Sequence, residues 1–185
     1  TAQQEARLTE ALANVSKPSV YLAGNSSMLS TAGDAMYQSD MIRLAGGVNA
    51  AGEISDPYWV EISYEQLLAW DPAYIILASD AAYTVEDVLT DPNLADCSAV
   101  INGNVRQLPS KAEAWDSPVP SGILGAVWLA NVLHPDLFTD ADFAFLKDKH
   151  ISLISMDCTN GILDMKYIGT LGKIKYLSQE EIFGY

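Results

Sequence analysis

The side chains of this chain that have the chemistry for catalysis are few and far apart. Nucleophilic catalysis needs a serine or cysteine within hydrogen-bond reach of a base that is itself held in place. The candidates by residue type are Ser26, Ser27, Ser30, Cys97 and Cys158. No Gly-x-Ser-x-Gly elbow surrounds the serines, and the histidines, His134 and His150, fall at a predicted helix end and near a change in charge. The sequence therefore predicts that the protein is not an enzyme, with a small α/β hydrolytic enzyme as the alternative.

Metal coordination by the chain itself is also disfavoured. A zinc site needs several cysteine, histidine or carboxylate ligands, usually at short spacings. Cys97 and Cys158 are the two cysteines, they lie 61 residues apart, and the chain has two histidines. The sequence predicts no protein-built metal site and no intrinsic cofactor. A disulfide between the cysteines stays open, and two free thiols are the favoured reading.

The glycine pair in "AGGVNAAGE" is the feature most like a phosphate-binding loop. In a dinucleotide fingerprint the glycines follow a strand and open a helix. Gly46 and Gly47 instead follow "MYQSDMIRLA", whose apolar residues have helical spacing. At the end of a helix, glycine supplies the left-handed residue that stops it. The pair therefore predicts a helix end and not a nucleotide site.

The elements expected along the chain alternate between helix and strand. Apolar β-branched runs predict buried strands at 19–24, 73–79 and 105–109. Periodic segments predict helices at 3–15, 36–47, 64–70, 84–92 and 121–135. Ser63 and Thr84 are the expected N-caps. This order predicts an α/β fold with a mainly parallel sheet flanked by helices.

The charge of the chain is strongly acidic and unevenly distributed. The formal net charge is −14, and residues 1–146 carry all of it with 19 acidic and 5 basic side chains. Residues 147–185 have five of each, so we expect a boundary near residue 147. An acidic surface repels phosphate backbones, which argues against a nucleic-acid partner. No apolar run approaches the roughly 20 residues that a membrane helix needs.

Four segments, taken in order and at their spacings, resemble one known family. They are "AGGVNAAG", "ISYEQLLAWDPAYIIL", "LADCSAVINGNVRQLP" and "AWDSPVPSGILGAVWLANVLHPDLF". Together they resemble the substrate-binding proteins of ABC importers for cobalamin, haem and ferric siderophores, the iron-complex family. The resemblance covers about residues 18–140 and corresponds to the carboxyl-terminal lobe of such proteins.

The resemblance implies a specific domain organisation. Proteins of this family have two Rossmann-like α/β lobes joined by one long helix, with the ligand between the lobes. Residues 1–16 would be the end of the interlobe helix, 17–146 the carboxyl-terminal binding lobe, and 147–185 a carboxyl-terminal extension. The sequence of this extension does not match the usual end of the family. The resemblance further implies that the amino-terminal lobe lies outside this chain, which would hold half of the binding site.

The resemblance also implies a function and its partners. The chain would belong to the substrate-binding component of an ABC importer that captures a metal chelate and delivers it to a membrane permease. Such a protein is extracytoplasmic, either periplasmic or lipid-anchored at the cell surface. Glu65 matches the position at which the family pairs with permease arginines. A surface interaction module without transport is a further alternative.

The ligand is expected where the strands end. Open α/β sheets bind ligands at the carboxyl ends of their strands, which are followed here by loops 25–31, 79–83 and 110–116. We expect the approach segment 57–59 to add to the rim. The predicted ligand-binding residues are Trp115, Trp59, Tyr83, Tyr58, Lys111, Ser27 and Met28. Aromatic side chains suit a macrocycle or chelate, and Lys111 would attract an anionic group.

Overall fold

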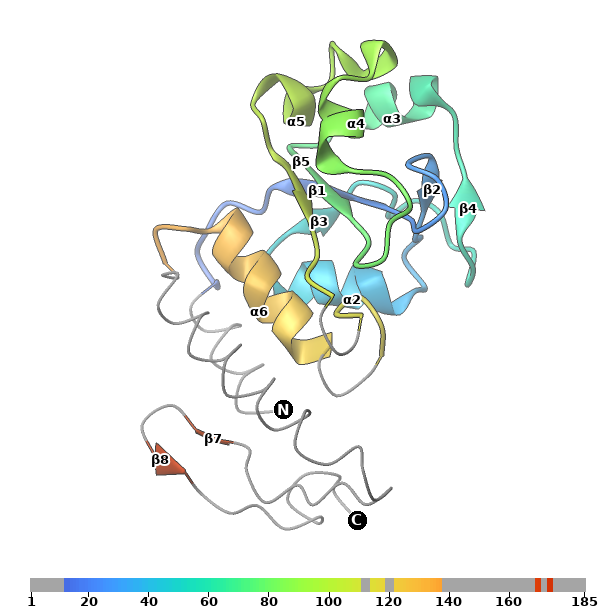
Figure 1. Cartoon of the computed structure of the whole chain (residues 1–185). Coiled ribbons are helices and arrows are strands. Elements are labelled where there is room, and N and C mark those ends of the chain that lie inside the picture. The colour runs from blue at the N-terminus through green and yellow to red at the C-terminus, as the bar shows by residue number, and fades with distance from the viewer. Residues whose placement is uncertain (1–11, 111–113, 119–121, 138–168, 171–172, 175–185) are drawn as a thin grey trace.

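The described part of the chain is a sheet between two layers of helices (Figure 1). The computed structural model describes residues 12–110, 114–118, 122–137, 169–170 and 173–174. One face of the sheet is covered by α2 (Tyr37–Leu44) and α6 (Gly122–Leu133). The other face is covered by α3 (Tyr64–Trp70), α4 (Val85–Leu89) and α5 (Ser98–Ile101). The α/β prediction is confirmed, while most of the predicted helix 3–15 and of the segment 147–185 lies outside the described residues.

The three predicted strands form the parallel centre of the sheet. They are β1 (Ser19–Ala23), β5 (Tyr74–Leu77) and β6 (Val105–Gln107). β1 pairs in parallel with β5 from Val20↔Tyr74 to Ala23↔Leu77, and β5 pairs in parallel with β6. The sheet is therefore mainly parallel, as the sequence predicts.

Further short elements were not predicted from the sequence. They are β2 (Ser30–Thr31), β3 (Val48–Asn49), β4 (Val60–Glu61) and the 3₁₀ helix η1 (Pro92–Leu94). β3 pairs in parallel with β1, whereas β2 pairs antiparallel with both β1 and β4. The strand order is β4-β2-β1-β5-β6, with β3 also on β1. A separate antiparallel pair joins β7 (Gly169–Thr170) to β8 (Lys173–Ile174).

The two faces of the sheet explain the apolar runs of the central strands. Alternate residues of a strand point to opposite faces, so a strand covered on both faces is apolar throughout. The face toward α2 and α6 buries Val20, Leu22 and Ile76. The face toward α3, α4 and α5 buries Tyr21, Ala23, Ile75 and Leu77. The strands are thereby fixed in register, which sets the position of the loops that follow them.

The glycine pair ends α2 in a Schellman motif, which confirms the predicted helix stop. Gly46 has φ +82°. Its N–H donates to the carbonyl oxygen of Arg43 at 3.0 Å, and the N–H of Gly47 donates to that of Ile42 at 2.9 Å. This is the hydrogen-bond pattern in which a left-handed glycine follows the last helical turn.

The predicted N-caps are also confirmed. The Oγ of Ser63 accepts a hydrogen bond from the N–H of Gln66 at 3.2 Å. Thr84 and Asp87 form a reciprocal capping box at the start of α4. Each cap satisfies backbone donors that have no partner within the helix.

Asp71 links two helices on the same face. It ends α3 with a left-handed backbone, φ 42°, although it is not glycine. Its carboxylate accepts hydrogen bonds from the N–H and the Oγ of Ser98, both at 2.7 Å, and these bonds lower the pKa of the carboxyl group. The start of α5 is thereby tied to the end of α3.

Among the described residues, no helix combines the length and the apolar character that a membrane crossing requires.

Candidate functional site

The strand order predicts a ligand crevice at the carboxyl ends of β1 and β5. The connection from β1 to β3 runs through α2 on one face, and the connection from β3 to β5 runs through α3 on the other. β3 and β5 thus lie on opposite sides of β1, and the two connections cover opposite faces of the sheet. Such a reversal of strand order is the switch point at which open α/β sheets bind ligands. The loops 24–31, 79–83 and the described parts of 110–116 all start at this end.

These loops are hydrogen-bonded to one another. The N–H of Ala82 donates to the carbonyl oxygen of Asn25 at 2.7 Å. The hydroxyl of Tyr83 donates to the carbonyl oxygen of Gly24 at 2.6 Å. The Oγ of Ser110 donates to Oδ1 of Asp80 at 2.7 Å. The segments that the sequence places at the strand ends therefore form one connected surface.

Trp59 and Tyr83 both contact the end of β1 at Gly24. A Cβ atom built on Gly24 would lie 3.2 Å from Cε3 of Trp59, so the indole lies close to this part of the backbone. Trp59 is 39% exposed, its neighbour Tyr58 is 76% exposed, and Tyr83 is half-buried. We call Tyr58, Trp59 and Tyr83 the aromatic rim. Their role in ligand binding remains a prediction.

Ser27 and Met28 lie in the loop after β1 and are half-buried. The Oγ of Ser27 accepts a hydrogen bond from the N–H of Leu29 at 3.1 Å, so this hydroxyl shapes the turn. The carbonyl oxygen of Met28 accepts one from the hydroxyl of Tyr21 at 2.9 Å. The Sδ of Met28 lies 4.0 Å from the hydroxyl oxygen of Tyr64. Ser27 is therefore bonded within the loop and Met28 to β1 and α3, and the ligand contacts of both remain a prediction.

Trp115, which the sequence predicts to face the ligand, is buried in this structure. Its side chain is only 2% exposed and is among the largest fully buried side chains of the described residues. The N–H of Trp115 donates to the Oγ of Ser79 at 3.0 Å. Its carbonyl oxygen would lie 2.2 Å from a Cβ on Gly125, so the backbone runs directly against α6. The loop turns inward because a glycine on α6 leaves room for it. Lys111 lies outside the described residues.

The surface around this end of the sheet is acidic. Glu61 and Asp80 are exposed there, and Asp116 is buried. Burial raises the pKa of Tyr83, and the charge of Glu61 raises it further. Burial likewise raises the pKa of Tyr37, and the charges of Asp116 and Asp40 add to that increase. A nearby negative charge disfavours a phenolate, so these carboxylates add to the effect of burial.

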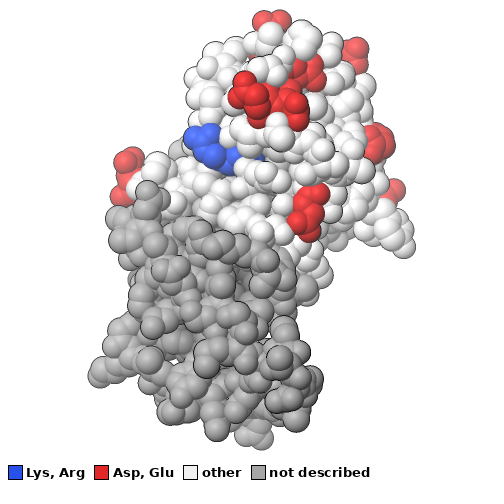
Figure 2. All heavy atoms as spheres, in the orientation of Figure 1, with Lys and Arg blue, Asp and Glu red and all other residues white. Residues whose placement is uncertain are grey.

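The basic side chains of the described residues lie elsewhere. Lys17 precedes β1, Arg43 lies on α2, and the guanidinium of Arg106 donates to the carbonyl oxygens of Gly103 and Val105. On the face drawn in Figure 2, acidic side chains predominate over basic ones.

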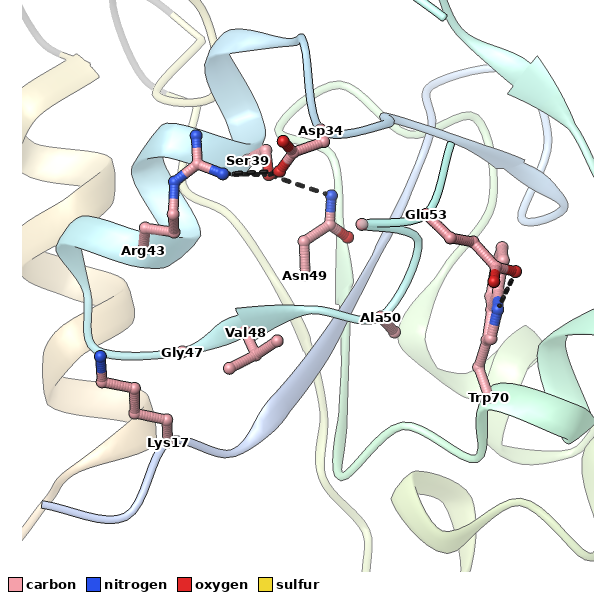
Figure 3. Close-up of a pocket in the computed structure, with 11 residues that line it drawn as sticks. Lys17, Asp34, Ser39, Arg43, Gly47, Val48, Asn49, Ala50, Glu53 and Trp70 are labelled. Carbon is pink, nitrogen blue, oxygen red and sulfur yellow. Dashed lines mark hydrogen bonds and ion pairs between the residues drawn. The ribbon is translucent and has the colours of Figure 1, made fainter. Parts of the chain in front are cut away.

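A surface hollow of about 550 Å³ lies away from the strand-end loops, beside β3 (Figure 3). Its lining comprises Lys17, Asp34, Ser39, Arg43, Gly47, Val48, Asn49, Ala50, Gly52, Glu53 and Trp70. β3 pairs with the amino-terminal half of β1, so this hollow flanks the opposite end of the sheet from the crevice.

The polar groups of this hollow are largely bonded to one another. Arg43 forms ion pairs with Asp34, at 2.6 Å, and with Asp40. The Nδ2 of Asn49 donates to the carbonyl oxygen of Ala32 at 2.9 Å, and the indole N–H of Trp70 donates to Oε1 of Glu53 at 2.9 Å. Because open α/β sheets bind ligands at the carboxyl ends of their strands, we place the candidate site there and not in this hollow.

Glu65 lies on α3, in the layer of helices that covers one face of the sheet. It is exposed in the first turn of α3, where its own backbone N–H and the hydroxyl of Ser63 lower the pKa of its carboxyl group. The side chain is therefore a fixed negative charge at a helix N-terminus, available for a basic partner.

Within the described ranges, no group of three or more His, Cys, Asp and Glu side chains is arranged to hold a metal ion. Cys97 is a free, buried thiol whose pKa is raised first by burial. Cys158 and His150 lie outside the described residues, and His134 is buried with Nε2 3.4 Å from the carbonyl oxygen of Gly46.

Comparison with known proteins finds relatives that are named as binding proteins. Residues 2–112 match the sequence profile of the family described as "Periplasmic binding protein". The chain is 34% identical over 115 residues to the molybdate-binding protein MolA of Haemophilus influenzae. The molybdate-bound structure of MolA aligns with a TM-score of 0.67 and 29% identity over 79% of this chain and 45% of that one.

Two further solved structures share the fold. A periplasmic solute binding protein of Veillonella parvula aligns with a TM-score of 0.71 and 24% identity, covering 98% of this chain and 51% of that one. Helicobacter pylori CeuE, crystallised with a nickel–histidine complex, aligns with a TM-score of 0.70 and 24% identity over 80% and 47% of the two chains.

This chain spans only part of the length of the relatives that it matches. The alignment with MolA includes 62% of this chain but only 32% of the sequence of MolA. In the structural alignments this chain covers about half of the length of each solved structure. The relatives are named as binding proteins of extracytoplasmic transport systems and not as enzymes. Because the family profile spans more than half of the chain, this chain belongs to the periplasmic binding protein family.

Proposed function

We propose that this chain forms the carboxyl-terminal lobe of the substrate-binding component of an ABC importer, and that the ligand is a metal chelate. The lobe would supply one wall of the binding site at the crevice between β1 and β5. An amino-terminal lobe would supply the other wall, and a membrane permease would receive the ligand outside the cytoplasm. The observation that carries the proposal is the aromatic rim, which lies at the switch point of a sheet whose family binds solutes.

Two ligand classes have to be weighed, because the relative MolA is named for molybdate. An oxyanion is bound through N–H groups and basic side chains, whereas a chelate offers a large organic surface that aromatic rings can cover. Glu61 and Asp80 are exposed at these strand ends, and the described residues there include no lysine or arginine, while Lys111 lies outside the described residues. Exposed Trp59 and Tyr58 add apolar area beside these charges. This combination favours a metal chelate over an oxyanion.

The proposal is tested by ligand titration of tryptophan fluorescence. We expect saturable quenching with at least one of three chelates: the cationic ferric complex of desferrioxamine B, cyanocobalamin or haemin. The reason is that Trp59 is exposed, while Trp70, Trp115 and Trp128 are half-buried or buried. Trp59→Phe should remove most of the quenching and weaken binding about three- to tenfold, since an aromatic contact contributes about 0.5–1.5 kcal/mol beyond its buried area.

Trp128→Phe is the matched control, since Trp128 lies on α6 and packs against the core cluster below the sheet. It should leave the titration unchanged. Equilibrium dialysis with molybdate provides the competing outcome. Saturable molybdate binding without binding of any chelate would replace the proposed ligand class, and the absence of binding to any of the four would contradict ligand capture by this chain.

We further propose that Glu65 docks on basic side chains of the permease. In cells that depend on the complete importer for the chelate, Glu65→Ala should lower uptake about tenfold, because truncating one partner of a buried charge pair leaves the other unpaired. Affinity for the chelate in solution should not change. Radiolabelled uptake and fluorescence titration measure the two effects separately.

Glu86→Ala is the control for this prediction. Glu86 is exposed and occupies the second position of α4, as Glu65 does in α3. Both substitutions remove one charge from the first turn of a short helix. Equal effects of the two on uptake would show that only the overall charge matters and that Glu65 has no docking role.

A further inference from the structure

Ser79 connects β5 to two other segments through all of its polar groups. It follows β5 directly and is 5% exposed. Its N–H donates to Oδ2 of Asp116 at 3.3 Å, and its Oγ accepts from the N–H of Trp115 at 3.0 Å. Its carbonyl oxygen accepts from Nε2 of Gln107 at 3.3 Å. Two of these bonds reach 36 and 37 residues along the chain, so they hold a loop and not a local turn.

Asp116 extends these contacts to the helices below the sheet. Its carbonyl oxygen accepts from Nε2 of Gln38, in the first turn of α2, at 2.8 Å. Asp116 and Gln38 are 4% and 8% exposed. The close approach of Trp115 to Gly125 adds α6. The segment 114–117 is therefore held by β5, α2 and α6 together.

Ser79 is also close in sequence to the aromatic rim. The loop that begins at Ser79 ends at Tyr83, and two hydrogen bonds already described join Ala82 and Tyr83 to Asn25 and Gly24. The N–H of Ala78 donates to the carbonyl oxygen of Ala23 at 2.8 Å, so the residue before Ser79 is also bonded to the end of β1. A displacement of Ser79 would thus be transmitted over four residues to the tyrosine of the rim.

We infer that Ser79 and Asp116 act as one positioning unit, which we call the latch, that holds the loops of the ligand crevice in their binding geometry. This inference rests on the proposed function. The latch touches no ligand, because both residues are buried. It acts by fixing the segment 114–117 and the loop 79–83 to each other, so that the aromatic rim is ordered before the ligand arrives. A preordered surface loses less conformational entropy on binding than a loose one.

The first test compares chelate affinity in variants of matched stability. Ser79→Ala removes the acceptor of the Trp115 N–H, and a buried donor without a partner is costly, so the loop should shift to regain one. We expect Ser79→Ala and Asp116→Ala each to weaken chelate binding about tenfold, measured by quenching of Trp59. Since the two residues act as a unit, the double variant should bind no more weakly than the weaker single variant.

Val88→Ala is the control for loss of stability alone. Val88 is fully buried on α4 and packs in the core on the other face of the sheet. It should lower the melting temperature by at least as much as Ser79→Ala and leave the affinity unchanged. If the latch variants keep the affinity of the unmodified chain, or if Val88→Ala weakens binding equally, the latch has no positioning role.

A second measurement needs no ligand and separates this inference from the proposed function. In the chain labelled with 5-fluorotryptophan, the fluorine resonance of Trp59 is identified by its loss in Trp59→Phe. We expect Ser79→Ala to shift or broaden that resonance, and Val88→Ala to leave it in place. An unchanged resonance in Ser79→Ala contradicts the latch even if chelates bind. A shifted resonance in a chain that binds no chelate supports the latch and contradicts only the proposed function.

Discussion

Replacing Trp115 by alanine should lower the free energy of unfolding by about 3–5 kcal/mol, the usual cost of truncating a buried tryptophan. The side chain is 2% exposed, so the substitution leaves a cavity in a packed region. The surrounding segment is fixed by Ser79 and by α6 and has little freedom to collapse into that cavity. Urea denaturation followed by far-ultraviolet circular dichroism measures the change.

Trp59→Ala is the comparison for this prediction. Trp59 is 39% exposed and should lose about 1 kcal/mol or less, because much of its surface is already in water. The pair distinguishes a core residue from a surface residue of the same type. If Trp115→Ala were nearly neutral for stability and abolished chelate binding instead, the expectation from sequence would be right and the buried position would be wrong.

Gly46→Ala should destabilise the fold by about 2–5 kcal/mol. A residue with a Cβ in the left-handed conformation costs about 1–2 kcal/mol, and overpacking a filled site costs about 1–3 kcal/mol more. Gly46 has φ +82°, and a Cβ there would lie 2.7 Å from Nε2 of His134 and 3.0 Å from Cδ2 of Leu12. Denaturant titration of the variant gives the total.

Gly103→Ala separates the two contributions. Gly103 has φ +65°, also left-handed, but nothing lies within 4 Å of the position a Cβ would take. It should therefore show the conformational cost alone, about 1–2 kcal/mol. Equal losses in the two variants would mean that Leu12 and His134 move aside freely, and that the end of α2 is not tightly packed.

The helix ends and the central strands could be predicted because their causes are local. Ser63 and Thr84 are hydroxyl residues that precede helical periodicity, and both cap as expected. Gly46 follows a periodic segment and adopts the left-handed conformation that this position requires. β1 and β5 are short runs of apolar residues buried on both faces. In each case the residues that determine the structure are within a few positions of it.

The short strands and the burial of Trp115 could not be predicted, because their causes lie far away in sequence. β2, β3 and β4 contain two residues each, too few to show a period. Trp115 stands in a segment rich in polar residues and prolines, which is typical of an exposed loop. It is buried because Ser79 binds its backbone and Gly125 admits it, and neither partner is visible from the loop itself.

The position of the candidate site followed from topology, while the roles of its side chains did not. Parallel strands bring their following loops to one end, so the convergence of the loops after β1 and β5 could be expected. Which aromatic residues stay exposed depends on packing. Trp59 and Tyr58 remain at the surface and Trp115 does not. Ser79 carried no signal in the sequence beyond its place after a strand.

The way the chain leaves β3 has a consequence for solubility. Beside the hollow of Figure 3, the N–H of Gly52 donates to the carbonyl oxygen of Asn49 at 3.1 Å, and the N–H of Ala51 donates to its Oδ1 at 3.0 Å. The chain therefore turns directly after Asn49, and β3 contains only two residues. Unpaired strand borders are the places where a second molecule can add its own strand and where fibrils begin. Because so short a strand presents few free backbone groups, β3 offers little template for a second strand and contributes little to aggregation.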